Sequence, residues 1–261
     1  MNEVVLEAKG LVKRFGGVSA LEGYDLRLAA NDLLGLIGPN GAGKTTAFNL
    51  LSGVLAPTAG TILVDGDDVT ALSTHRRARL GIARTFQNVR LFQDLTVLEN
   101  VMVGAHHRLA SGLAASLLGL PRARRSEGAI RAAAFAALAA VSLEAAAGER
   151  AGDLAYGRQR MVEIARALAT DPRVLLLDEP AAGMNPNETG ALVRMIARLH
   201  GERRLAIIVV EHDMRLVAAL CHRVQAISKG ELLAAGTPDE VLHDPAVVEA
   251  YLGAGWTAAD A

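Results

Sequence analysis

Short runs of valine, isoleucine and leucine alternate along this chain with segments whose apolar residues recur at helical spacing. The runs Leu33–Ile37, Val174–Leu177 and Leu205–Val210 carry no charge, which is typical of strands buried on both faces of a sheet. Thr61–Val64 predicts a further strand, and Asp65-Gly66 after it predicts a hairpin turn. Strands that alternate with helices favour a layered α/β fold.

Capping residues mark the predicted helices. Thr96 and Glu99 fit a capping box that opens a helix to about Gly104, and Asn185-Pro186 opens another to about His200. Further helices are predicted at Lys44–Leu51 with Gly53 as its C-terminal cap, at Arg158–Ala169 and after Thr237. Residues 105–150 are rich in alanine and predict a helical insertion, and residues 253–261 predict a frayed end.

Composition limits the class of protein. Of 261 residues, 51% are hydrophobic and 21% charged, which excludes an intrinsically disordered chain. Lys and Arg number 27 against 28 Asp and Glu, a net charge of −1, so the overall charge does not attract nucleic acid. The single Cys221 fits a reducing compartment. We expect no signal peptide, and no uncharged stretch reaches the roughly 20 residues of a spanning helix.

The strongest motif is the segment Gly38–Thr45, which reads Gly-Pro-Asn-Gly-Ala-Gly-Lys-Thr. It matches the phosphate-loop pattern and lies between a predicted strand and a predicted helix, as the motif requires. Backbone N–H groups of such a loop, with those of the helix start, surround phosphates. Lys44 adds a positive charge at the β- and γ-phosphates, and the Thr45 hydroxyl is placed to bind Mg²⁺.

Two carboxylates follow the predicted strand Val174–Leu177. Asp178 emerges at the carboxyl end of this strand, where ligands bind in open α/β sheets. Asp178 is therefore a candidate for holding Mg²⁺ through water, and Glu179 for polarising an attacking water. No Asn-Lys-x-Asp motif for reading guanine occurs in the sequence, which disfavours a GTPase.

Four further segments resemble motifs of the ABC ATPases. Leu154–Arg160 resembles their signature motif, residues 84–87 their Q-loop, and Glu211-His212-Asp213 their switch histidine, while Phe15 matches the aromatic residue that stacks on adenine. Order and spacing agree over nearly the whole chain. The resemblance implies a P-loop NTPase of the ABC ATPase type, with a RecA-like core and an antiparallel β-subdomain (residues 1–87 and 165–261) and an inserted α-helical subdomain (residues 88–164).

The resemblance also implies which residues form the site. Glu179, His212 and Gln87 are the implied catalytic residues, and Thr45, Gln87 and Asp178 the implied ligands of Mg²⁺. The implied ATP-binding residues are Phe15 at adenine, Asn40, Gly41, Ala42, Gly43, Lys44, Thr45 and Thr46 at the phosphates, and Ala155, Tyr156 and Gly157 across a head-to-tail dimer.

Details of the motifs resemble the LivG-type subfamily, the ATP-binding subunits of bacterial branched-chain amino-acid importers. Leu-Ala-Tyr-Gly replaces Leu-Ser-Gly-Gly in the signature, and residues 84–92 and 178–189 resemble the corresponding segments of that subfamily. The implied partners are a second ATPase subunit (the same chain or a LivF-like homologue), transmembrane permease subunits and, indirectly, a periplasmic solute-binding protein, but no nucleic acid. The implied location is peripheral, on the cytoplasmic face of the inner membrane.

Departures from the general ABC pattern leave alternatives open. Ala155 removes a serine hydroxyl, Tyr156 replaces a flexible glycine, and Asn185 replaces an aspartate that many relatives have. Lipopolysaccharide export is an alternative, because its ATPase subunits are similar. A soluble ABC ATPase acting on DNA or ribosomes is disfavoured by the single phosphate loop and the lack of a basic stripe, and a non-catalytic ATP binder by the retained Lys44 and Glu179.

Overall fold

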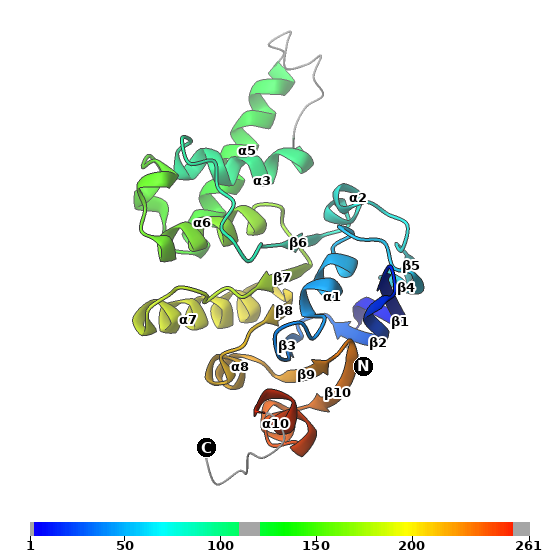
Figure 1. The fold of residues 1–261 in the computed structure, drawn as a ribbon. Helices are drawn as coiled ribbons and strands as arrows, with labels where there is room; N and C mark the ends of the chain where they lie inside the picture. Colours follow the sequence, from blue (N-terminus) through cyan, green and yellow to red (C-terminus); the bar gives the residue numbers. More distant parts are fainter. Residues whose placement is uncertain (1–2, 110–120, 253–261) are drawn as a thin grey trace. The chain divides into compact units, whose positions relative to one another are not determined.

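The computed structural model of this protein describes residues 3–109 and 121–252. Contacts divide the chain into two compact units. Unit 1 comprises residues 1–82, 173–180 and 196–261, and unit 2 comprises residues 83–172 and 181–195. The predicted frayed end, residues 253–261, lies outside the described residues. Figure 1 follows the chain through its helices and strands.

The larger sheet of unit 1 combines buried parallel strands with an exposed antiparallel strand at one edge. These strands are β3 (Leu33–Ile37), β6 (Ile82–Arg84), β7 (Val174–Asp178), β8 (Ala206–Val210), β9 (Arg223–Ser228) and β10 (Glu231–Gly236). Their order is β10-β9-β3-β8-β7-β6, and unit 1 ends within β6. β3 runs parallel to both β8 and β9, β7 runs parallel to β8, and β10 is antiparallel to β9.

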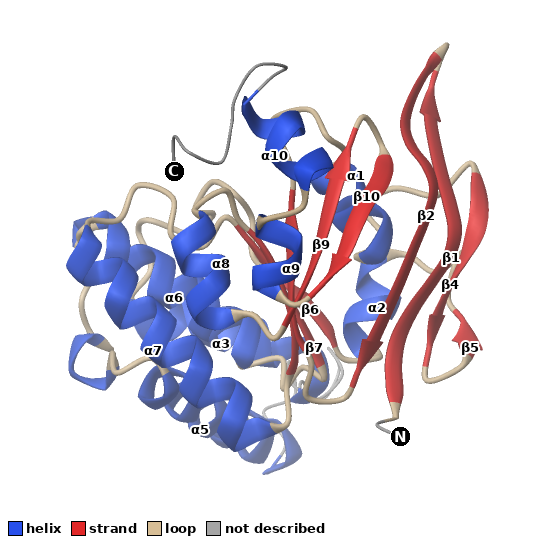
Figure 2. Cartoon of the chain, turned by 90° about the horizontal axis from the view of Figure 1, so that it is seen from below, coloured by secondary structure: helices blue, strands red, loops and turns tan. Residues whose placement is uncertain are grey.

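An antiparallel sheet forms the other layer of unit 1 (Figure 2). Its strands are β1 (Val4–Phe15), β2 (Val18–Ala29), β4 (Ala59–Val64) and β5 (Asp67–Asp68), in the order β2-β1-β4-β5. Between β4 and β5, Asp65 and Gly66 both have positive φ, 52° and 88°, the conformation of a tight hairpin turn. The predicted turn at Asp65-Gly66 is therefore confirmed.

Short helices complete unit 1. They are α1 (Lys44–Leu51), α2 (Thr74–Arg79), α8 (Met214–Leu220), α9 (Pro238–Leu242) and α10 (Pro245–Leu252). α1 has the predicted bounds, and Gly53 after it has a φ of 76°, as expected of a residue that ends a helix. Thr237 and Glu240 form the full capping box that opens α9.

Unit 2 is helical. It contains α3 (Val97–Leu109), α5 (Pro121–Ala140), α6 (Tyr156–Leu168), the 3-10 turns η1 (Glu144–Ala146) and η2 (Ala151–Asp153), and the start of α7 (Pro186–Arg203), which ends in unit 1. The predicted Thr96–Glu99 capping box is present. Within the described ranges, none of the helices combines the length and the apolar character that a membrane span requires.

The predicted end of the first of these helices was wrong, because α3 continues past Gly104 to Leu109. Gly104 does not terminate the helix but lets another helix approach closely. A Cβ at this position would lie 2.1 Å from the carbonyl oxygen of Arg166 in α6. Only a residue without a side chain fits this contact, so the glycine serves packing within unit 2.

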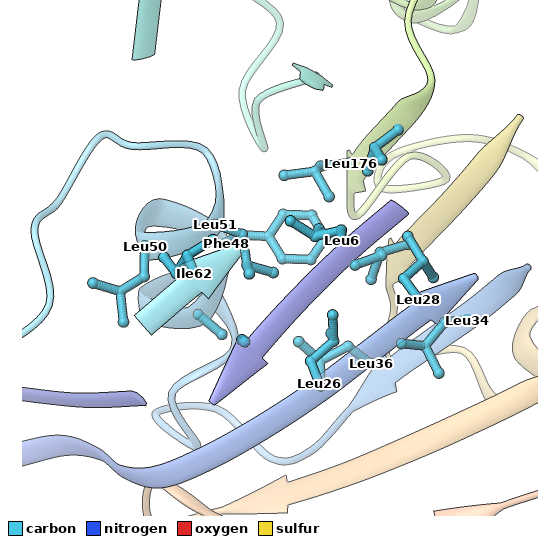
Figure 3. Packing of buried hydrophobic residues seen from close by; sticks show 14 of the residues in the cluster. Leu6, Leu26, Leu28, Leu34, Leu36, Phe48, Leu50, Leu51, Ile62 and Leu176 are labelled. Carbon is cyan, nitrogen blue, oxygen red and sulfur yellow. The ribbon is translucent and has the colours of Figure 1, made fainter. Parts of the chain in front are cut away.

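The main core of unit 1 lies where α1 meets both sheets (Figure 3). Phe48 of α1 is completely buried there, together with Leu6 of β1, Leu28 of β2 and Leu36 of β3. Because β3 and α1 are both anchored in this core, the segment that joins them, residues 38–43, is held at both of its ends.

Candidate active site

Glycine shapes the segment between β3 and α1. Gly38, Gly41 and Gly43 have φ values of 153°, 80° and 108°, which L side chains rarely adopt. A Cβ on Gly43 would also lie 2.6 Å from the carbonyl oxygen of Ala20. Among the residues that the structure describes, no side chain caps the amino end of α1, so the first N–H groups of this helix are available to an anion.

Lys44 folds back over this loop. Its Nζ donates hydrogen bonds to the carbonyl oxygens of Gly38, at 2.6 Å, and Pro39, at 3.0 Å. Burial lowers the pKa of Lys44 from its ordinary value, and the charges of Glu179 and Asp178 oppose this shift. The ammonium group is therefore positioned inside the loop and electrostatically coupled to both carboxylates.

Asp178 and Glu179 follow directly on a buried strand. Asp178 ends β7 and is 2% exposed. The Glu179 N–H donates to the carbonyl oxygen of Val210, at 2.9 Å, and Glu179 has a φ of 45°. A positive φ at a residue other than glycine often marks a functional turn. The chain bends sharply here, at the carboxyl end of β7.

His212 follows the neighbouring strand β8. Its N–H donates to the carboxylate of the buried Glu211, at 3.2 Å, while its ring nitrogen Nδ1 lies 3.8 Å from the same carboxylate. The His212 side chain is 63% exposed, so it is accessible to a ligand. β3, β8 and β7 are adjacent and parallel, which brings the loop, His212 and Asp178 to the same edge of the sheet.

Phe15 lies at the tip of the β1–β2 hairpin, paired with Val18. Phe15 is 49% exposed, and the Lys13 ammonium lies 5.1 Å from the ring centroid. An exposed aromatic face beside a cation is suited to stacking on a nucleobase.

Gln87 belongs to unit 2, where its main chain is fixed by α6. Arg160 donates to the carbonyl oxygens of Phe86 and Gln87, each at 2.5 Å. Glu163 pairs with Arg160 at 2.8 Å and accepts from the N–H groups of Phe86 and Arg90, each at 3.4 Å. Arg166 also donates to the carbonyl oxygen of Arg90, at 2.6 Å. The segment from Phe86 to Arg90 is thus held by three charged side chains of one helix.

The residues of the predicted signature open the same helix. Ala155 is the N-cap of α6 and makes no side-chain cap. Tyr156 is 43% exposed and contacts Gly183, where a Cβ would lie 3.1 Å from the ring atom Cε1. A Cβ on Gly157 would lie 2.7 Å from Glu188 Oε1. Gly157 therefore permits a close packing that a larger residue would not.

Asn185 caps α7. Its side-chain oxygen accepts from the N–H groups of Asn187 and Glu188, each at 3.0 Å, and Glu188 accepts from the Asn185 N–H. An aspartate would make the same capping bonds, so the replacement of aspartate by Asn185 preserves the start of the helix.

Comparison with known families assigns these motifs. The profile of the ABC transporter family matches residues 21–182, which include the phosphate loop, the signature and Asp178. This chain belongs to the ABC transporter family. A second profile, that of branched-chain amino acid ATP-binding cassette transporters, matches residues 231–257 of this ABC ATPase.

Relatives that match over nearly their full length indicate which kind of ABC ATPase this chain resembles. This ABC ATPase is 46% identical to the high-affinity branched-chain amino acid transport ATP-binding protein BraF of Pseudomonas aeruginosa, and 45% to LivG of Escherichia coli; each alignment covers 97% of this chain and 99% of the relative. The lipopolysaccharide export ATP-binding protein LptB of Escherichia coli is 36% identical over 95% of this chain and 97% of LptB.

Solved structures confirm the predicted fold. The ADP conformation of an ATP-binding cassette from an ABC transporter has a TM-score of 0.84 and 30% identity, covering 96% of this chain and 99% of that one. The predicted α/β fold, with a parallel core sheet and an antiparallel β-subdomain, is therefore confirmed, and so is the prediction of an ABC ATPase that binds ATP.

The predicted site residues of this ABC ATPase fall into both units. Unit 1 brings the phosphate loop (Asn40, Gly41, Ala42, Gly43, Lys44, Thr45, Thr46) to Asp178, Glu179 and His212, and also holds Phe15. Gln87, Ala155, Tyr156 and Gly157 lie in unit 2. The individual roles of these residues stay predictions.

Sequence reasoning missed the charged pair that fixes the Q-loop of this ABC ATPase. Arg160 and Glu163 are 0% and 1% exposed. Their signal was present in the sequence: opposite charges stand three residues apart on a helix, beside the apolar Met161, Val162 and Ile164. A charged pair on an apolar face indicates a buried polar contact, but its main-chain partners lie more than 70 residues away.

Proposed function

We propose that this chain is the subunit whose ATP hydrolysis powers import of branched-chain or related amino acids through an ABC transporter. The observation that carries the proposal is the 46% and 45% identity, over nearly the full length of both chains, to BraF and LivG, whose names state this transport. The profile match at residues 231–257 supports it, because it extends the likeness beyond the general ATPase motifs.

Binding of ATP uses an aromatic face and a cationic loop. Phe15 offers its exposed ring to adenine. Backbone N–H groups from Asn40 to Thr46 face the phosphates. Lys44 exchanges its bonds to the carbonyl oxygens of Gly38 and Pro39 for bonds to the β- and γ-phosphates. This exchange is favourable because a bond to a charged oxygen is stronger than one to a neutral carbonyl.

The residues present fit a bound Mg²⁺. The Thr45 hydroxyl and the Asp178 carboxylate of unit 1 are hard oxygen donors of the kind that this ion prefers, and Asp178 is buried beside Lys44. The Gln87 amide oxygen stays a predicted third donor. When bound, Mg²⁺ neutralises charge on the β- and γ-phosphates.

Hydrolysis requires a water molecule in line with the γ-phosphate. Glu179 orients this water and accepts its proton. The sharp turn at Glu179, with a φ of 45°, favours this role because it fixes the main chain that carries the carboxylate. His212 donates a hydrogen bond to the γ-phosphate as charge develops in the transition state. Its exposed ring is free to reach a ligand at the edge of the sheet.

A second ATPase subunit completes the site in this proposal. The N-terminus of α6, with Ala155, Tyr156 and Gly157, supplies N–H groups and a positive dipole end to the γ-phosphate of the facing subunit. The partner is a second copy of this chain or a LivF-like homologue. The division into a core (residues 1–87 and 165–261) and a helical subdomain (residues 88–164) belongs to the same proposal.

Permease subunits bind the segment after Gln87. Phe92 is 53% exposed, while its main-chain N–H and carbonyl oxygen bond to the side chain of the buried Asn100. A fixed backbone with an exposed aromatic side chain is suited to a protein interface. Through the permeases, the ATPase acts with a periplasmic solute-binding protein and sits peripherally on the cytoplasmic face of the inner membrane, without nucleic acid.

Purification of the complex from its native membrane tests this function against lipopolysaccharide export. We expect permease subunits to co-purify and ATP hydrolysis to rise when a binding protein loaded with leucine is added. Stimulation by lipopolysaccharide and none by the loaded binding protein would favour the exporter, to whose LptB the identity is lower, at 36%.

A further inference from the structure

The C-terminal helix of the described chain contacts the phosphate loop. Tyr251 lies near the end of α10, and its hydroxyl oxygen accepts a hydrogen bond from the Gly38 N–H, at 2.5 Å. The two residues are 213 positions apart in sequence. Gly38 is the first residue of the loop, directly after β3, so the bond is made where the chain leaves the sheet.

The position of Gly38 depends on several such contacts. Its carbonyl oxygen accepts from Lys44 Nζ, at 2.6 Å, and its Cα faces β9 so closely that a Cβ would lie 2.1 Å from the carbonyl oxygen of Ile227. Farther along the loop, the Gly230 N–H donates to the carbonyl oxygen of Ala42, at 2.9 Å. The C-terminal part of unit 1 thus supports the loop along its length.

We infer that Tyr251 is a positioning residue for the phosphate loop, holding Gly38 in the conformation that binds nucleotide phosphates. This inference rests on the proposed role of the loop in ATP binding. The hydroxyl bonds Gly38, whereas the proposed phosphate contacts run from Asn40 to Thr46, so Tyr251 and the nucleotide use different N–H groups. Tyr251 acts on ATP only through the main chain of the loop.

The surroundings of Tyr251 suit this role. Burial raises the pKa of Tyr251 to about 12, against the opposing effect of the hydrogen bond from Gly38. The group therefore stays a neutral hydroxyl at physiological pH and adds no negative charge beside the phosphates. A neutral acceptor fixes the Gly38 N–H without repelling the nucleotide.

The test compares two variants that each lose one tyrosine hydroxyl. Tyr251→Phe removes the bond to Gly38 and keeps the ring. Tyr24→Phe is the matched control, because the Tyr24 hydroxyl donates to Gln225 Oε1, at 2.6 Å, in the same unit. Tyr24 is completely buried, and its hydroxyl bonds Gln225 rather than the phosphate loop. Loss of the Tyr24 hydroxyl therefore reports the general effect of a missing hydrogen bond on stability.

Binding of MgADP to the full chain, measured by calorimetry, is the first readout. We expect Tyr251→Phe to raise Kd about three- to tenfold, the effect of one lost hydrogen bond, and Tyr24→Phe to change it less than twofold. In ATP hydrolysis, Tyr251→Phe raises KM with little change in kcat, since binding rather than chemistry is weakened. The Gly38 amide proton exchanges faster in Tyr251→Phe.

The comparison of Tyr251→Phe with the wild type and with Tyr24→Phe decides whether Tyr251 positions the phosphate loop. If Tyr251→Phe lowers the melting temperature but leaves Kd and KM as in the wild type, Tyr251 has only a structural role and the inference is wrong. If the wild-type chain itself does not bind MgADP, the proposed function fails and the inference with it. Wild-type binding, together with a Tyr251→Phe defect that Tyr24→Phe does not share, supports the inference.

Discussion

Arg160 and Glu163 form an ion pair of 2.8 Å that is almost completely withdrawn from water in unit 2. Both side chains also bond the main chain around Gln87: Arg160 to the carbonyl oxygens of Phe86 and Gln87, and Glu163 to the N–H groups of Phe86 and Arg90. The helix that begins with the signature residues therefore fixes the main chain of the Q-loop.

Replacing Arg160 tests this relationship. Arg160→Met removes the 2.8 Å pair and leaves the buried Glu163 with the longer, 3.8 Å pair to Arg166, so we expect the free energy of unfolding to fall by about 3–5 kcal/mol. The amides of residues 86–90 should also exchange faster with solvent, because their bonds to α6 are lost. Chemical denaturation and hydrogen exchange measure the two effects.

The control is Arg158→Met on the same helix. Arg158 makes an exposed pair with Glu149 at 3.5 Å, and such pairs contribute about 0–1 kcal/mol. Equal stability losses in both variants would show that the buried pair does not hold the Q-loop.

Lys44→Ala should weaken nucleotide binding. The variant loses the charged donor that the proposal gives to the β- and γ-phosphates, and we expect Kd for MgATP to rise about 10- to 100-fold. Lys9→Ala is the control, since Lys9 is exposed and paired only with Glu7 in the described structure. Unaltered affinity in Lys44→Ala, measured by equilibrium binding, would refute the assignment of Lys44.

Glu179→Gln should separate binding from hydrolysis. The amide keeps the shape of the side chain but accepts no proton, so kcat should fall about 10²- to 10⁴-fold while MgATP still binds. Glu202→Gln makes the same change on the exposed part of α7 and should keep wild-type turnover. Phosphate release under single-turnover conditions is the measurement, and wild-type rates in Glu179→Gln would remove Glu179 from the mechanism.

The Cys221 thiol should be inert in the folded protein. Burial, and then the charge of Glu211, raise the pKa of Cys221 from 9.0 to about 12. At pH 8 the thiolate fraction is then about a thousandfold lower than in the unfolded chain. Because the folded pKa is the higher one, the stability that the neutral thiol contributes is present below pH 9 and lost as the pH rises toward 12.

Alkylation by iodoacetamide measures this reactivity. We expect slow labelling at pH 8 in native buffer and rapid labelling in denaturant. Rapid labelling of the native chain would mean that Cys221 does not pack against β3, where a Cβ on Gly35 would lie 3.1 Å from its sulfur.

The elements that the sequence predicted are those with a simple pattern. β3 and residues 174–177 of β7 are uninterrupted apolar runs, and both strands are buried along their whole length. β1 and β2 were not predicted, although each spans 12 residues. Their pairing shifts register between Ala8 and Leu11 and again between Lys13 and Arg14, and such bulges disrupt the alternation by which a strand is recognised.

The candidate site likewise has a part that the sequence predicts and a part that it does not. The phosphate loop is contiguous in sequence, and glycine spacing alone predicts its conformation. The contacts that support it from a distance follow from tertiary packing. Tyr251 reaches Gly38 across 213 residues, and nothing in the local sequence around either residue indicates this bond.

Uptake of labelled leucine into proteoliposomes tests the central claim most directly. The vesicles contain this ATPase assembled with its permeases. MgATP is supplied on the side of the membrane that carries the ATPase, and the solute-binding protein on the other side. Uptake is compared with and without MgATP. We predict uptake that requires ATP, is lost in Glu179→Gln and is kept in Glu202→Gln. Equal uptake by the wild type and Glu179→Gln would contradict the account.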